Sequence, residues 1–572
     1  MPYPRVVDAR AVDSDGVHGR RGPSHCPLAR RLLPVSPNPV NPVTPVSPNP
    51  GSPNPVPSNP PSPISDHRGE QPGPAGGARR RRALAVSALV LAGLQTSTGL
   101  AAAQDSARPA RTGLDWQLCA TATPDWPIKN DTRTECAELS VPMDYAKPGG
   151  RKITIAVSRV KATDRKTSEA PIVFSLGGPG TYNITNSATM TQRGLATLNT
   201  NRDFIGLDIR GSGYSDRIDC VDKPFAEPAP TAPEKSFKKA EFDHQAEFNN
   251  RCAAIDPEFV RQITPENAAR DIDRLRTALG TEKLSFHGAS FGTAVGLAYR
   301  SLFDHRTERM WLDSVMPPKR HWPTMDTEME APGKADFAPF VTWLTKRDAE
   351  YHLGTDDSTV RQRLGDLRSE LEKKPRTGGG VRLSGNWVID QALRPQEEWD
   401  EAAKNLVAVR NGGTPATPPA AASEPTTPRP FGLGNPRTGF NNLQYNAMLC
   451  NTATASRGFG ELWTAREARR TADPMTGGTQ FTTWCAQWPL NAPPAKSTHG
   501  KSALQLSGHL YEGVTPYVWA EQARDATGGT LLTIPDKGHA SVPETPCAAE
   551  KAITFFRTGR QAGGTCTDGQ QP

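Results

Sequence analysis

The sequence predicts an α/β fold, in which a mostly parallel sheet carries helices on both faces and is interrupted by an inserted, mainly helical cap. Strand and helix patterns alternate between about residues 150 and 315, the alternation stops between about 317 and 500, and it then resumes. Alternation of this kind is typical of a parallel sheet, because each connecting helix covers a face of the sheet. The 572 residues suffice for one large domain with an insertion.

Three segments of the mature chain follow from this pattern. Residues 104–316 are expected to form the first part of the core, 317–500 the helical cap and 501–572 the last part of the core. Within the cap, a Pro/Ala/Thr tract at 414–430 is expected to be a solvated loop.

The first strands and the first long helix have distinct signals. Residues 153–160 alternate between apolar and polar at a period of two, whereas 171–176 and 204–208 are continuous apolar runs typical of buried strands. A helix is expected over 265–279, because Thr264 can cap its first turn and apolar residues recur along one face.

The remaining core elements flank the predicted cap. Short β-branched and aromatic runs predict strands, and amphipathic segments beside Gly and Pro predict helices. In chain order these are a strand at 284–287, a helix at 291–301, a strand at 310–315, a strand at 503–507, a helix after Pro516, a strand at 531–534 and a helix at 544–556.

The amino-terminal region differs in composition from the rest. Thirteen of the 55 prolines fall between Pro34 and Pro63, and such repeats form neither helix nor sheet, so residues 1–78 are expected to be a disordered leader or absent from the mature protein. The formal net charge of +7 is concentrated there, since residues 1–103 hold 11 Arg and no Lys against 5 acidic residues. The nearly neutral remainder argues against nucleic-acid binding.

Residues 79–103 have the pattern of a signal peptide. Four arginines precede a short apolar run at 83–94, and Ala101–Ala103 provide a small-residue cleavage site. The apolar run is too short to span a bilayer, so no stable membrane anchor is expected. The sequence therefore predicts secretion after cleavage near Ala103.

Cysteine usage is consistent with export. Besides Cys26, the chain holds eight cysteines, an even number that fits a disulfide set in an oxidising compartment. Pairing between neighbours in the sequence is our expectation, although spacing alone leaves other pairings open. No C-x-x-C pair or clustered Cys/His spacing indicates a metal site, and no cofactor is expected. The eight are Cys119, Cys136, Cys220, Cys252, Cys450, Cys485, Cys547 and Cys566.

The pentapeptide Gly288–Gly292 has the pattern G-x-S-x-G between a predicted strand and a predicted helix. Glycines relieve crowding where a chain reverses sharply, which leaves the Ser290 hydroxyl exposed beside a helix amino terminus. Ser290 is therefore the candidate nucleophile. A tetrahedral oxyanion needs preformed donors, and we assign these to the amides of Phe291 and of Gly178 in the glycine-rich loop 176–180.

The base and the acid are assigned by their order in the chain, Ser, then acid, then His. His539 follows the penultimate strand and is the candidate base; His509, His499 and His287 are weaker alternatives. Glu512 is the only carboxylate between Gly508 and Pro516 and would orient His539. Asp525 and Asp536 remain possible acids, though less well placed.

Several segments together resemble the secreted tripeptidyl aminopeptidases of the α/β-hydrolase fold, which are relatives of the prolyl iminopeptidases. The resemblance covers roughly residues 115 to 566 and includes Cys119, Cys136, Cys485, Cys547 and Cys566. Its motifs are, in chain order, 176–180, 208–215, 288–293, 312–317, 514–516 and 538–539.

The resemblance implies a serine exopeptidase that releases tripeptides, or other short peptides, from substrates with a free N-terminus. It also implies that the inserted cap limits substrate entry. The substrate's α-ammonium needs an anionic partner once desolvated, and Glu328 and Glu330, early in the cap, are the candidates.

The chain departs from the family pattern at the acid, where Glu512 replaces the usual Asp, and at Phe291, where Tyr is usual. Asn451–Thr452 stand after Cys450 in place of an acid. Two alternative functions follow. The same residues could act on esters or other acyl substrates, since fold and triad do not fix the acyl group. The altered acid loop would also fit an inactive binding protein.

Overall fold

The computed structural model describes residues 113–123, 125–415, 437–454, 457–494 and 497–567. The predicted leader and signal peptide, and most of the tract at 414–430, lie outside the described residues.

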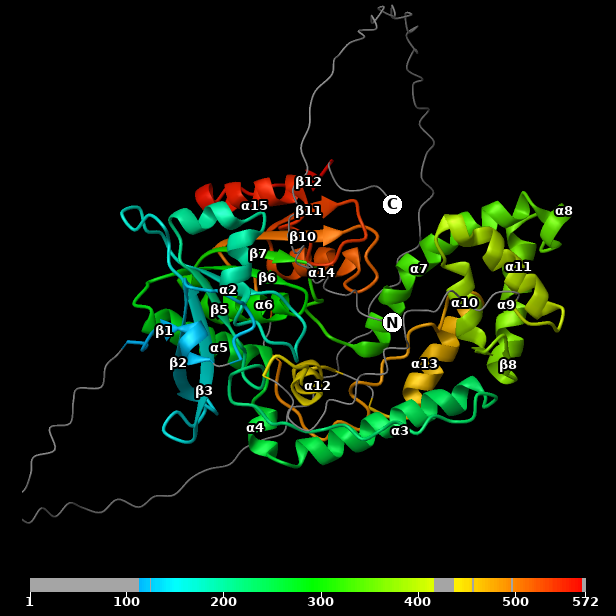
Figure 1. The fold of residues 1–572 in the computed structure, drawn as a ribbon, viewed down its shortest axis with the longest axis horizontal. Helices are drawn as coiled ribbons and strands as arrows, with labels where there is room; N and C mark the ends of the chain where they lie inside the picture. The colour runs from blue at the N-terminus through cyan, green and yellow to red at the C-terminus, as the bar shows by residue number, and fades with distance from the viewer. Residues whose placement is uncertain (1–112, 124, 416–436, 455–456, 495–496, 568–572) are drawn as a thin grey trace, which may run out of the picture. The chain divides into compact units, whose positions relative to one another are not determined.

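A ten-stranded sheet forms the core of the described residues, in the order β1-β2-β3-β5-β4-β6-β7-β10-β11-β12 (Figure 1). From β5 to β12 neighbouring strands are parallel, whereas β1, β2 and β3 pair antiparallel at one edge. This arrangement confirms the predicted, mostly parallel α/β fold. The strands are β1 (Gln117–Leu118), β2 (Thr134–Pro142), β3 (Lys152–Val160), β4 (Ile172–Ser175), β5 (Phe204–Leu207), β6 (Leu284–Ala289), β7 (Thr307–Asp313), β10 (Ala503–His509), β11 (Thr530–Ile534) and β12 (Gly564–Thr565).

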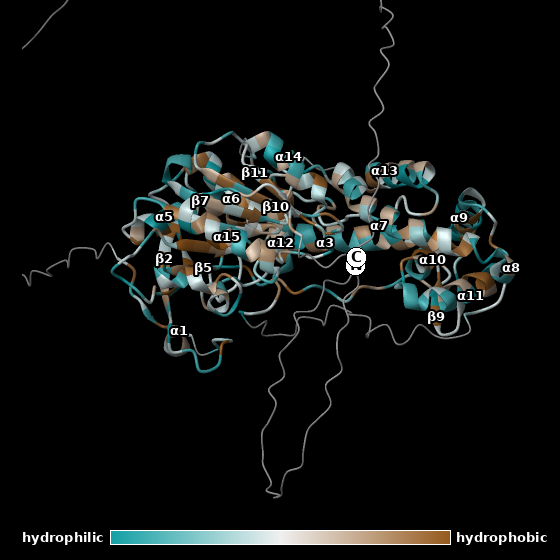
Figure 2. Cartoon of the chain, turned by 90° about the horizontal axis from the view of Figure 1, so that it is seen from above, coloured by the Kyte–Doolittle hydropathy of each residue, from teal (hydrophilic) through white to brown (hydrophobic). Residues whose placement is uncertain are grey.

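Helices cover both faces of the sheet. Apolar residues of α5, α6 and α14 pack on one face, and residues of α2 and α15 pack on the other. Figure 2 shows the hydrophobic colour along the strands, which the helices enclose. The core helices are α1 (Cys119–Ala122), α2 (Asn186–Thr189), α3 (Glu234–Ala253), α4 (Pro257–Arg261), α5 (Pro265–Ala278), α6 (Gly292–Phe303), α14 (Tyr517–Thr527) and α15 (Pro546–Thr558), with short 3₁₀ turns η1 (Met190–Gln192), η2 (Ala196–Thr200) and η3 (Asp304–Arg306).

The start of α5 shows why these elements form where the sequence predicts them. The hydroxyl of Thr264 accepts a hydrogen bond from the amide of Asn267 at 3.1 Å, and Pro265 occupies the first turn. Thr264 thereby satisfies one of the backbone donors that every helix start leaves free.

The segment between β7 and β10 is mainly helical and has a hydrophobic core of its own, formed by α7, α9, α10 and α11. In Figure 1, α9, α10 and α11 lie grouped together with β8, apart from the ten-stranded sheet. The insertion comprises α7 (Trp322–Thr345), α8 (Asp348–Tyr351), α9 (Asp357–Lys373), β8 (Arg376–Gly378), β9 (Val381–Leu383), α10 (Gly385–Ala392), η4 (Gln396–Glu398), α11 (Trp399–Arg410), α12 (Asn442–Cys450) and α13 (Phe459–Ala472).

Helix α3 precedes the nucleophile strand in the chain but packs against the cap. The side-chain amide of Asn249 donates to the backbone carbonyl oxygens of Trp484 at 3.0 Å and Ala486 at 2.8 Å. The side-chain amide of Asn446 donates to the side-chain oxygen of Asn249 at 2.9 Å. The sequence pattern did not predict this helix. Although α3 lies before the predicted boundary at 316, it contacts residues of the predicted cap.

Four disulfides join cysteines that are neighbours in the sequence, as expected. They are Cys119–Cys136, Cys220–Cys252, Cys450–Cys485 and Cys547–Cys566. Disulfides of this number are typical of extracellular proteins. Within the described part of the chain, we find no helix with the length and apolarity that crossing a bilayer requires.

Candidate active site

Ser290 occupies a sharp turn between β6 and α6. Its φ of +53° lies in the left-handed region that non-glycine residues rarely adopt, a form of strain found at functional turns. Both glycines of the pentapeptide are required by close packing. A Cβ on Gly288 would lie 2.8 Å from the Phe286 ring and 3.0 Å from the Gly292 carbonyl oxygen, and a Cβ on Gly292 would overlap the carbonyl of Ser175 in β4.

The glycine-rich loop after β4 lies directly against the candidate nucleophile. Gly177 has a φ of +102°, and a Cβ there would lie 2.7 Å from the Cβ of Ser290 and 3.3 Å from its hydroxyl oxygen. Among the described residues, the amides of Phe291 and Gly178 find no hydrogen-bond acceptor. Both donors assigned to the oxyanion are therefore unused and stand next to the Ser290 turn.

The cap holds this glycine loop in place. The amide of Asn441, at the start of α12, donates to the Gly180 carbonyl oxygen at 2.8 Å, and the Gly180 amide donates to the Gln444 side-chain oxygen. The loop is thus fixed at its far end by α12 and at its start by the Leu176 amide, which donates to the side-chain oxygen of Asn183 at 3.2 Å.

His539 and Glu512 lie on the loops that follow β11 and β10. Nδ1 of His539 donates to Oε1 of Glu512, because a carboxylate can only accept, and in the neutral imidazole this places the acceptor on Nε2. The Glu512 side chain is 1% exposed and that of His539 is 24% exposed. Thr515 donates to the same carboxylate oxygen from its amide at 3.0 Å and its hydroxyl at 2.5 Å, and Ser314 donates to Oε2 at 3.0 Å.

The Ser290 turn and the His539 loop meet at the end of β7. The amide of Ser290 donates to the Asp313 carbonyl oxygen at 3.0 Å, while the amide of Ala540 donates to the Ser314 hydroxyl at 2.9 Å. A cavity of about 300 Å³ lies beside His539 and is also lined by Leu176, the residue before Gly177. The nucleophile, base and acid candidates therefore gather at one edge of the sheet.

His509 is unsuited to the role of base. Its imidazole is buried between Asp313, 3.1 Å from Nε2, and Asp536, 2.5 Å from Nδ1. Burial alone would lower the pKa of His509, but these carboxylates outweigh it and raise the pKa to about 10. A histidine that already holds a proton on each nitrogen cannot accept one from serine.

His287 and His499, the other two alternatives, are also unsuited to act as the base. His287 is buried, and its ring packs against Phe174 and Phe556; burial lowers its pKa to about 4. His499 is exposed and precedes β10, at the opposite end of the strand from Glu512.

The alternative acids also have other partners. Asp536 is bonded to His509 and to the amide of Gly538, and Asp525 projects from α14 beside Arg524. Of the three carboxylates considered from the sequence, Glu512 is the one in contact with His539.

Glu328 and Glu330, the candidates for holding the substrate's α-ammonium, both have partners within the protein. The Trp519 indole donates to Oε2 of Glu328 at 2.5 Å, and the Gln522 amide donates to its Oε1 at 2.7 Å. Glu330 pairs with Arg469 at 3.1 Å and accepts the Gln480 amide at 3.0 Å. Glu328 thus attaches α7 to α14 and Glu330 attaches α7 to α13, so their contacts give no support to substrate binding.

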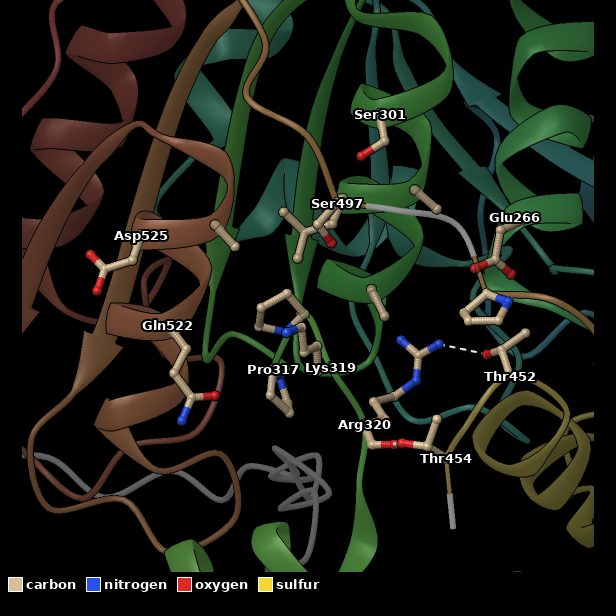
Figure 3. A pocket seen from close by; sticks show the side chains of 16 residues that line it. Glu266, Ser301, Pro317, Lys319, Arg320, Thr452, Thr454, Ser497, Gln522 and Asp525 are labelled. Atoms are coloured by element: carbon tan, nitrogen blue, oxygen red, sulfur yellow. Dashed lines mark hydrogen bonds between the residues drawn. The ribbon is translucent and has the colours of Figure 1, made fainter. Parts of the chain in front are cut away.

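A larger cavity of about 960 Å³ lies on the face formed by α6, α14 and the segment 317–320. Figure 3 shows Arg320 pointing toward Thr452, whose hydroxyl accepts its hydrogen bond at 2.6 Å. Of the residues considered for the reaction from the sequence, the alternative acid Asp525 lines this cavity, whereas Ser290, His539 and Glu512 do not. We therefore place the site at the smaller cavity beside His539.

Three residues that contact the candidate site were not identified from the sequence. They are Ser314 and Thr515, which bond to Glu512, and Gln444, which bonds to the glycine loop. Ser314 and Thr515 belong to motifs 312–317 and 514–516, which carry the family resemblance, so their positions were noted without a role. Gln444 lies in a helix that carries no recognisable signal, and only its contact with Gly180 shows its importance.

Two family models and several known proteins are similar to this chain. Residues 170–361 match the family model described as alpha/beta hydrolase fold, and residues 473–566 match the one described as TAP-like protein. The tripeptidyl aminopeptidase of Streptomyces lividans is 30% identical over 486 residues, which cover 80% of this chain and 87% of that protein. The chain belongs to the tripeptidyl aminopeptidase family. It is thus a serine peptidase of the α/β-hydrolase fold.

Two further relatives widen the comparison. Serine protease Hip1 of Mycobacterium tuberculosis is 29% identical over 508 residues, which cover 83% of this chain and 94% of that protein. Carboxylesterase B of the same species is 26% identical over 472 residues, covering 78% of this chain and 88% of that protein.

Proposed function

We propose that this member of the tripeptidyl aminopeptidase family releases tripeptides, or other short peptides, from free N-termini through an acyl-enzyme on Ser290. The observation that carries the proposal is the bond between His539 and Glu512 on two loops that meet the Ser290 turn at the end of β7. A serine hydroxyl is a weak nucleophile until a neighbouring base accepts its proton, and an oriented imidazole is the usual base.

In the proposed reaction, Ser290 attacks the scissile carbonyl while Nε2 of His539 takes the hydroxyl proton. The imidazolium then gives this proton to the leaving amine, and water releases the acyl group by the same steps. Glu512 keeps the proton on Nδ1 and stabilises the imidazolium. The amides of Phe291 and Gly178, which have no other acceptor in the described chain, would hold the oxyanion.

The cap would set the length of the released peptide. Helix α12 contacts the glycine loop through Asn441 and Gln444, so an extended substrate at Ser290 meets the cap close to the scissile bond. Helix α12 would therefore leave room for a short acyl segment beside Ser290 and exclude a long one.

Two assays test the proposal. Covalent labelling by a fluorophosphonate should occur in the unmodified protein and disappear in Ser290→Ala. Tripeptidyl chromogenic substrates should be cleaved much faster than their N-acetylated counterparts, because acetylation removes the α-ammonium. Equal cleavage of the two would reject recognition of the N-terminus, and absence of labelling would favour an inactive binding protein.

An acyl-ester hydrolase is the second candidate, favoured by the likeness to carboxylesterase B. Strong turnover of short acyl esters, with none of peptides that have a free N-terminus, would support it.

We also propose that the protein is exported. The four disulfides support an oxidising compartment, and the segment at 79–103 has the pattern of a signal peptide. Amino-terminal sequencing of the mature protein should find a first residue near Gln104.

A further inference from the structure

Ser314 lies one residue beyond β7 in an unfavourable backbone conformation. Its φ is +50°, and its side chain is fully buried. A left-handed backbone is costly for any residue with a Cβ, and glycine would adopt it without this cost. A serine at such a position therefore needs a compensating contribution from its hydroxyl.

The hydrogen bonds of this hydroxyl have only one possible direction. The amide of Ala540 can only donate, so the Ser314 oxygen accepts there at 2.9 Å. The hydroxyl proton is then free to be donated to Oε2 of Glu512 at 3.0 Å. One hydroxyl thus joins the acid to the residue that follows the base, across 198 and 226 positions of the sequence.

The carboxylate of Glu512 needs this second contact. Its Oε1 faces His539 and Thr515, whereas Oε2 has Ser314 as its described hydrogen-bond donor. Without a donor at Oε2 the carboxylate would be held through Oε1 alone, and its plane could turn relative to Nδ1. A glutamate has one more rotatable bond than an aspartate, so its carboxylate depends more on such a restraint.

Building on the proposed triad, we infer that Ser314 is a positioning residue: its hydroxyl fixes the Glu512 carboxylate and the His539 loop relative to each other, so that the imidazole faces Ser290. It contacts neither substrate nor the reacting atoms in this arrangement. Its loss should therefore lower kcat and leave KM unchanged.

Ser314→Gly and Ser314→Ala form the decisive pair. Both remove the hydroxyl, but Gly also relieves the backbone strain that Ala retains. We expect kcat for a tripeptidyl substrate to fall about 10- to 100-fold equally in both variants, as for loss of a hydrogen bond to a charged group. KM should stay within about twofold of its original value, and Ser314→Gly should melt at a higher temperature than Ser314→Ala.

A merely structural role predicts a different outcome. The activity loss would then follow the melting temperature, and Ser314→Gly would retain kcat within about threefold; this result would overturn the inference. Ser215→Ala is the matched control, because the Ser215 hydroxyl is also buried, accepts the Ala156 amide at 2.9 Å and donates to the Asp208 carbonyl at 2.6 Å. Its kcat should remain unchanged.

A double-mutant cycle with Glu512→Asp tests the route through the acid. If Ser314 acts through Glu512, the double variant Ser314→Gly/Glu512→Asp should lose no more kcat than the more damaging single variant. Losses that multiply would overturn this route.

Ser290→Ala separates this inference from the proposed function. If Ser290→Ala abolishes labelling and turnover while Ser314→Gly keeps its original kcat, the positioning role alone is wrong. If Ser290→Ala retains turnover, both the proposed triad and the role of Ser314 are wrong.

Discussion

Nδ1 of His539 donates a hydrogen bond to Oε1 of Glu512, although the two residues lie on separate loops after β11 and β10. Glu512 stands where the resemblance seen in the sequence leads us to expect an aspartate. Thr515 and Ser314 hold one oxygen each, so the longer side chain remains in a single orientation.

Replacing Glu512 tests whether its charge is needed. Glu512→Gln should lower kcat by about 10³- to 10⁴-fold, because an amide cannot stabilise the imidazolium and can donate to Nδ1, which favours the wrong tautomer. Steady-state kinetics with a tripeptidyl substrate measure the effect, with circular dichroism to verify folding. Activity within about tenfold of the original would mean that the acid lies elsewhere.

Gly177→Ala tests the close approach of the glycine loop. The added Cβ would lie 2.7 Å from the Cβ of Ser290, so either the loop or the Ser290 turn must move. A shift of this kind should lower kcat by about 10²-fold. Gly280→Ala is the control, since Gly280 also has a positive φ, +70°, but open space around it. It should cost about 1 kcal/mol of stability and no activity. Equal kcat in both variants would contradict the role of the loop.

Glu328→Gln tests whether Glu328 stabilises the packing of α7 on α14 or binds the substrate. We expect a loss of about 1–3 kcal/mol of unfolding free energy, because the bonds from Trp519 and Gln522 lose a charged acceptor. The preference for free over acetylated tripeptidyl substrates should not change. A selective rise in KM for the free substrates would restore the role that the sequence suggested.

His509 predicts an alkaline loss of stability. Burial opposes its charge, but Asp313 and Asp536 raise its pKa from 6.5 to about 10. A raised pKa in the folded state means that the stabilisation is complete below about pH 6.5 and declines as the pH rises toward about 10. The melting temperature should fall over this interval.

His509→Gln provides the comparison for that decline. At neutral pH it should lower the free energy of unfolding by roughly 3–5 kcal/mol, because the buried Asp313 and the half-buried Asp536 lose their cation. Its melting temperature should then depend less on alkaline pH than that of the original protein. If the melting temperatures of the two proteins fell in parallel with rising pH, the decline would come from groups other than His509.

Local patterning was enough to locate much of the core and the main candidate site residues. The strand 204–208, the cap of α5 at Thr264 and the turn around Ser290 each depend on residues within a few positions of one another, so propensity and periodicity register them. The placement of Ser290, Glu512 and His539 in the chain follows from the order of the strands, because the ends of parallel strands meet at one edge of the sheet.

The hydrogen-bond partners of several residues come from distant parts of the chain. Glu328 looks like a free cap carboxylate in the sequence, and only packing of α7 against α14 brings Trp519 and Gln522 onto it. Helix α3 and Ser314 likewise take their roles from partners far away in the chain. Side-chain hydrogen bonds between such partners depend on three-dimensional packing and leave no periodic trace in the sequence, whereas helices, strands and turns do.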